Sequence, residues 1–165
     1  QYLEKTYGIP YIYHSLHGLE NTMNFIQSIT NIEGYELNQE KYEEEISKIK
    51  EQLFTVKRKF FFYKEMKKCA IFGDYDTVIG MKSLIEELGL EVDRAEVLYQ
   101  TEVEEPLVAG GTEFDRMKYL KQESLLLLLG DGATIEMDYT AKSSHQVSNP
   151  NLHHIMIYPY TPCIG

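Results

Sequence analysis

The stretch that most constrains the fold runs over residues 67–90. It begins with an apolar run at residues 69–72, which is too short for a helix and is typical of a strand buried on both faces. After a polar turn, apolar residues recur at helical spacing, at Val78, Met81, Leu84, Ile85 and Leu88. A second strand is predicted over residues 90–98. Strand, helix and strand together predict a right-handed βαβ unit, the start of a parallel sheet.

The rest of the chain alternates in the same way between strand-like and helix-like lengths. Strands are predicted over residues 9–14, 125–129 and 154–158, and helices over residues 19–34, 39–66, 112–123 and 133–139. This alternation predicts an α/β fold, a three-layer Rossmann-like sandwich with a mostly parallel sheet. Residues 1–66 would supply a strand and two helices that lead into the core, and residues 67–165 would form the Rossmann-like domain.

Both ends of the chain are abrupt. Residues 1–7 resemble the last turns of a helix that Gly8 stops, and the chain ends directly after a predicted strand. These features indicate a piece of a longer polypeptide.

Charge and cysteine content exclude several classes of partner. The formal net charge of −10 argues against nucleic acid, because phosphate recognition needs clustered Lys and Arg. Two cysteines, Cys69 and Cys163, make no disulfide framework and favour a cytoplasmic setting. No run approaches the ~18 apolar residues of a membrane helix, so no membrane partner is expected.

Polar residues follow each predicted strand, and these are the candidate site residues. In an open parallel sheet, ligands bind outside the carboxyl ends of the strands. The candidates for cofactor binding are therefore His14, Ser15, His17, Asp74, Tyr75, Asp131, Tyr158 and Cys163.

The turn after residues 69–72 allows two interpretations. It lacks the further glycines of a dinucleotide loop, and its two carboxylates, Asp74 and Asp76, would repel a pyrophosphate. They could instead hold Mg²⁺, as in a phospho-receiver that uses Asp131 as phosphate acceptor. The simpler interpretation is that both aspartates cap the following helix. The histidines match no zinc spacing, whereas a Cys163 thiolate could ligate a metal.

Four segments, taken in order, resemble the nitrogenase component 1 type proteins. They are YLEKTYGIPYIYHSLHGLENTMNFIQSI, KKCAIFGDYDTVIGMKSLIEELGLEV, LLLLLGDGATIE and HHIMIYPYTPCIG. The family includes nitrogenase molybdenum–iron subunits, cofactor-assembly scaffolds and dark-operative protochlorophyllide reductase subunits. The resemblance implies a wall of a cavity for an iron–sulfur-type metallocluster or a tetrapyrrole, with no catalysis by this piece alone. It also implies a homologous sister subunit and an ATP-dependent iron-protein reductase as partners.

The chain departs from the family pattern at its cofactor ligands. The family's cluster cysteines lie in an N-terminal domain that these residues do not include, and the loop that carries a cofactor histidine reads Tyr158-Pro159-Tyr160 here. No family ligand can therefore be assigned to a residue of this sequence, and the isolated chain is expected to hold no cofactor. The aromatic run at residues 60–63 suggests in addition that the long helix packs on the sister subunit.

Overall fold

The computed structural model describes residues 2–8, 11–32, 34–61, 68–98, 102–104, 106–137 and 140–148. Its elements, in chain order, are α1 (Tyr2–Tyr7), α2 (Leu19–Thr30), α3 (Gln39–Phe61), β1 (Lys68–Gly73), α4 (Tyr75–Glu87), β2 (Glu91–Val97), β3 (Val108–Ala109), α5 (Glu113–Gln122), β4 (Leu127–Gly130), α6 (Gly132–Glu136) and β5 (Ser143–Gln146).

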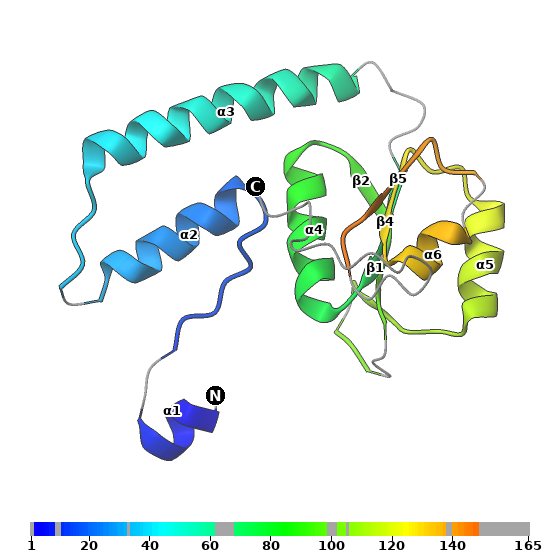
Figure 1. Ribbon diagram of the computed structural model, residues 1–165, viewed down its shortest axis with the longest axis horizontal. Helices are drawn as coiled ribbons and strands as arrows, with labels where there is room; N and C mark the ends of the chain where they lie inside the picture. Colours follow the sequence, from blue (N-terminus) through cyan, green and yellow to red (C-terminus); the bar gives the residue numbers. More distant parts are fainter. Residues whose placement is uncertain are drawn as a thin grey trace.

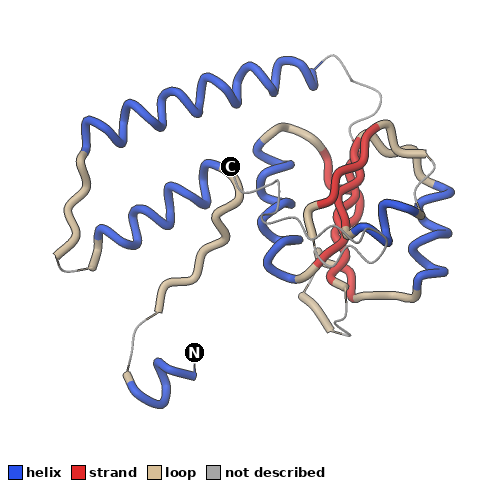
Figure 2. The backbone as a smooth tube through the Cα atoms, in the orientation of Figure 1, coloured by secondary structure: helices blue, strands red, loops and turns tan. Residues whose placement is uncertain are grey.

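The five strands form one parallel sheet in the order β3-β2-β1-β4-β5. Helices cover both faces, with α4 on one side and α5 and α6 on the other (Figures 1 and 2). The α/β fold with a parallel sheet is thus confirmed. From β1 the chain crosses to β2 through α4, and later returns through α5 to place β4 on the other side of β1. The strand order therefore reverses between β1 and β4.

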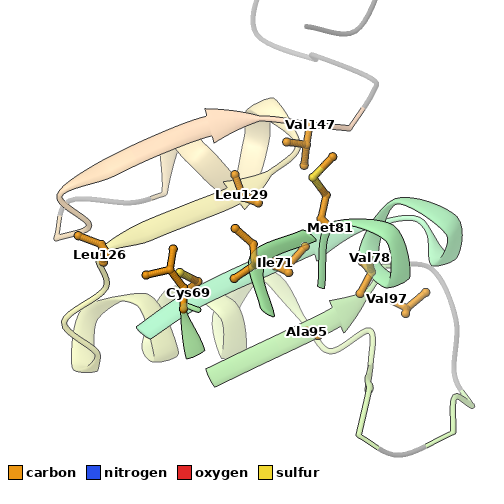
Figure 3. Close-up of a cluster of buried hydrophobic side chains, with 11 residues drawn as sticks. Cys69, Ile71, Val78, Met81, Ala95, Val97, Leu126, Leu129 and Val147 are labelled. Carbon is orange, nitrogen blue, oxygen red and sulfur yellow. The ribbon is translucent and has the colours of Figure 1, made fainter. Parts of the chain in front are cut away.

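The core lies on both faces of β1, whose residues 69–72 have no exposed surface. Cys69 and Ile71 point towards α4, where they pack with Val78, Met81 and Leu129 (Figure 3). The alternate residues, Ala70 and Phe72, belong to a second cluster on the α5 face with Leu98, Leu120, Leu125 and Leu128. Because successive side chains point to opposite faces, one strand contributes to both clusters.

Most predicted elements are confirmed, and four details differ. Residues 11–17 are irregular, so the strand predicted over 9–14 is wrong in its described part. Two short strands, β3 and β5, lie where neither a strand nor a helix is predicted. Of the two aspartates expected to cap α4, Asp74 is the cap, whereas Asp76 lies within the first turn. The strand predicted at 154–158 lies outside the described residues.

An N-terminal layer packs on α4 through a carboxylate. Glu87, the last residue of α4, accepts hydrogen bonds from the backbone N–H groups of Leu19 and Glu20 at 2.9 and 2.8 Å. It thereby caps the first turn of α2 with negative charge, which the helix dipole favours. Gly18 is needed there because its φ is 86° and a Cβ would meet the Glu87 carboxylate. None of the helices formed by described residues is long and apolar enough to cross a membrane.

A buried carboxylate ties β2 to the loop before α5. Glu96 has no exposed surface, and it contacts Arg94 at 2.6 Å and Arg116 at 3.4 Å. The backbone N–H of Gly111 also donates to Glu96 at 3.2 Å. Arg94 lies over the ring of Tyr119, 4.8 Å from the ring centroid, which extends the network onto α5.

Replacing Glu96 by glutamine tests this network. Glu96→Gln keeps the shape of the side chain but removes the negative charge between two guanidinium groups. The free energy of unfolding should therefore fall by about 1.5–3 kcal/mol. Urea unfolding at pH 7 measures the change. Glu104→Gln, at an exposed position, should stay within about 0.5 kcal/mol of the parent. Equal stability of both variants would show that the Glu96 network adds nothing.

Candidate functional site at the carboxyl edge of the sheet

Two aspartates flank the point at which the strand order reverses. Asp74 follows β1 and Asp131 follows β4, and these strands are neighbours in the sheet. Each carboxylate is used as a helix cap, because Asp74 accepts from the Thr77 N–H at 3.0 Å and Asp131 from the Thr134 N–H at 2.7 Å. The capping interpretation of the sequence therefore holds for Asp74.

Asp74 is held in its charged form. Partial burial acts to raise the pKa of this carboxyl, but hydrogen bonds from the backbone and hydroxyl of Thr77 outweigh it and lower the pKa below its usual value. A fixed carboxylate at the N-terminus of α4 occupies the place where a phosphate would bind. Asp131 occupies the corresponding place at the N-terminus of α6. Two carboxylates in these places make the binding of a nucleotide phosphate at this edge unfavourable.

The residues that directly follow β5 also reach the carboxyl end of β1. Ser148 is buried, and a Cβ built on Gly73 would lie 3.4 Å from the Ser148 Cβ. Since β4 separates β5 from β1, the chain must cross the end of β4 to make this approach. Figure 3 shows Val147 beside Met81 of α4, at the start of this crossing. The ends of three strands thus meet at one edge.

The irregular segment at residues 11–17 lies along the first half of α4. The Tyr13 hydroxyl donates a short hydrogen bond to Asp76, in the first turn of α4. Ser15 Oγ lies 2.9 Å from His17 Nδ1, and both side chains press on Gly80, where a Cβ would overlap them. Two predicted candidates, Ser15 and His17, therefore lie together against Gly80, about one turn of α4 beyond Asp76.

The other candidates are distributed differently. His14 turns back onto α2, where its Nε2 lies 2.8 Å from Ser28 Oγ and its ring packs edge-on against Phe25. The structure therefore places it apart from Ser15 and His17. Tyr75 is partly exposed in the first turn of α4. Tyr158 and Cys163 lie outside the described residues.

The described residues do not provide a ligand set for a metal cluster. Within them, no three His, Cys, Asp or Glu side chains converge to hold a metal ion. Burial raises the pKa of the Cys69 thiol to about 11, so a thiolate is disfavoured there. The edge offers the Tyr13 hydroxyl and two carboxylates that cap helices, those of Asp74 and Asp131.

Tyr13, Gly80 and Ser148 are not among the candidates that the sequence offers, because their contacts form only when segments far apart in the sequence come together. A small residue inside a helix, as at Gly80, commonly marks a close approach, and it is the one signal that could have been used. The sequence offers Asp76 as a helix cap or Mg²⁺ ligand, whereas in the structure its carboxylate accepts a hydrogen bond from the Tyr13 hydroxyl.

A side chain at Gly80 should displace the N-terminal segment. Gly80→Ala would place a methyl group on Ser15 and His17, which should cost about 1–3 kcal/mol of stability or expose residues 11–17. Limited proteolysis near Tyr11 and Tyr13, with urea unfolding, detects either result. Ser83→Ala, on the same helix, serves as control. Unchanged stability and cleavage in Gly80→Ala would show that the segment does not pack on α4.

The Tyr13–Asp76 hydrogen bond should be visible in a titration. This bond, with smaller contributions from burial and nearby carboxylates, raises the pKa of Tyr13 from 10.0 to about 12. The pKa of Tyr13 is higher in the folded state than in the unfolded state. The bond therefore stabilises the fold below pH 10, and its contribution to the free energy of unfolding is lost as the pH rises towards 12. The difference in absorbance at alkaline pH between the parent and Tyr13→Phe isolates this group. A midpoint near 10 would contradict the bond.

Comparisons with known proteins agree with this architecture. A search of curated proteins found no match. The family model for nitrogenase component 1 type oxidoreductase matches residues 1–165, the whole length of the chain. The chain therefore belongs to the nitrogenase component 1 type oxidoreductase family.

Proposed function

We propose that this chain forms part of the wall of a cavity that holds a metallocluster or a tetrapyrrole, in a nitrogenase component 1 type oxidoreductase. Family membership supports redox chemistry of this kind in the parent protein. The wall would be the carboxyl edge of the sheet, with Tyr75 and Asp131 as contact residues. Catalysis would need other parts of the protein, because the described residues offer no ligand set.

One observation carries this proposal more than the others. Tyr13, which donates to Asp76 in the first turn of α4, lies at the edge where the strand order reverses, and Asp74 and Asp131 follow the two neighbouring strands there. Parallel sheets bind their ligands at that edge. The partners would be a homologous sister subunit and an ATP-dependent iron protein, and the setting would be the cytoplasm.

A receiver-like module that binds Mg²⁺ through Asp74 and Asp76 is the alternative. Its support is the position of both carboxylates after β1. The hydrogen bonds that Asp74 accepts from Thr77 and Asp76 accepts from Tyr13 count against this alternative, because a metal ion would have to replace both bonds. Titration with millimolar Mg²⁺ while tyrosine fluorescence is recorded decides the matter. A response that Asp74→Asn abolishes would favour the receiver, and its absence would remove that reading.

Asp131→Asn in the natural protein tests the cavity wall. Asparagine caps a helix as well as aspartate does, so the fold is kept while one negative charge leaves the edge. If the edge faces the redox cofactor, the reduction potential should rise by an amount on the order of tens of millivolts, because the oxidised form loses a stabilising charge. A redox titration of the purified protein measures this shift.

Glu91→Gln is the matched control. Glu91 is exposed at the first position of β2, at the opposite edge of the sheet. Its replacement by glutamine therefore removes one negative charge, as Asp131→Asn does, but far from the carboxyl edge. Its potential should equal that of the parent. No shift in Asp131→Asn, or an equal shift in both variants, would contradict a cofactor at the carboxyl edge.

A further inference from the structure

Helix α2 begins without a cap of its own. Its N-cap residue is Gly18, which has no side chain to offer, and the carboxylate of Glu87 on α4 takes this role instead. The twelve residues described for α2 include no buried one, so this helix lacks the buried apolar face that stabilises most helices. Figure 1 shows α2 beginning beside α4 and running away from the sheet. The start of α2 therefore depends on a residue of another helix.

The N-terminal segment meets α4 at three places that share one face of that helix. They are Asp76, Gly80 and Glu87, and spacings of four and seven residues place side chains on the same side of a helix. At a rise of about 1.5 Å per residue, the first and last of these places are about 16 Å apart. The opposite side of α4 carries residues that are buried against the sheet, Val78, Met81 and Ile85.

The segment before α2 is held mainly by these contacts. No backbone–backbone hydrogen bond joins residues 11–17 to another described segment. Ser15 and His17 fit against α4 only because residue 80 is a glycine, where a Cβ would lie 2.3 Å from either side chain. Tyr13 holds one end of the segment and Glu87 holds the other. A single helix thus provides both end contacts and the close approach between them.

We propose that residues 13–20 act as a strap that docks on α4 as one unit, with Glu87 as the latch that also starts α2. A carboxylate is unfavourable at the C-terminus of its own helix and favourable at the N-terminus of α2, so docking gives the Glu87 charge a stabilising partner. The strap links the carboxyl edge of the sheet to α2. A group that draws Tyr13 away from Asp76 therefore loosens the first turn of α2, whatever ligand that edge binds.

Glu87→Ala in the full-length natural protein tests the latch. Chymotrypsin cleaves after Tyr11 and Tyr13, and cleavage there should become about tenfold faster, because the variant loses two hydrogen bonds to a charged group. Cleavage follows the population of the open form when opening is fast. Glu86→Ala is the matched control, since it removes the same charge one residue earlier but from a carboxylate that pairs with Lys82. Its cleavage rate should equal that of the parent.

Tyr13→Phe tests the coupling from the other end. It keeps the ring but removes the hydroxyl that donates to Asp76. Hydrogen exchange at residues 18–23 should become several-fold faster, because a coupling between two sites is reciprocal. Exchange at residues 81–85 of α4 should stay at the parent rate. This variant decides the matter even if Glu87→Ala does not fold.

Three results would overturn the proposal. The first is faster exchange at residues 18–23 in Glu87→Ala with unchanged cleavage after Tyr11 and Tyr13, because Glu87 would then be only a local cap. The second is an equal effect of Glu86→Ala and Glu87→Ala on cleavage. The third is exchange at residues 18–23 that Tyr13→Phe leaves at the parent rate.

Discussion

The fold depends on a strand that has no exposed face. Residues 69–72 of β1 are fully buried, so helices must cover both sides of the sheet. In a parallel sheet such cover comes from the crossover helices, and here α4 covers one face while α5 and α6 cover the other. The chain therefore leaves β1 in one direction and returns on its other side. The reversal between β1 and β4, and with it the position of the candidate site, follows from this arrangement.

The edge beyond β1 and β4 is built from groups that already have partners. Asp74 and Asp131 cap helices and Asp76 accepts from Tyr13, while Ser15 and His17 pair with each other farther along α4, on Gly80. We propose that this polar surface surrounds a cofactor whose ligands come from other parts of the protein.

Local patterns were sufficient to predict the sheet and most of its helices. The apolar run at residues 69–72 and the helical spacing of the apolar residues at 78–88 both depend on neighbours in the sequence. The strand β5 was missed because Ser143–Gln146 is polar and lies at the sheet edge, where burial imposes no apolar pattern. Residues 9–14 carry β-branched and aromatic side chains, yet residues 11–17 lie along α4 with no strand beside them. The approach of Ser15 and His17 to Gly80 is a long-range contact that no local pattern encodes.

The central claim is that the carboxyl edge of this sheet faces the cofactor. Hydrogen exchange on the natural protein, purified with its cofactor and again after extraction of the cofactor, tests it most directly. The account predicts faster exchange after extraction in peptides that cover residues 73–77 and 130–134, and unchanged exchange at residues 91–93 on the opposite edge. Equal changes at both edges, or no change at residues 73–77 and 130–134, would contradict it.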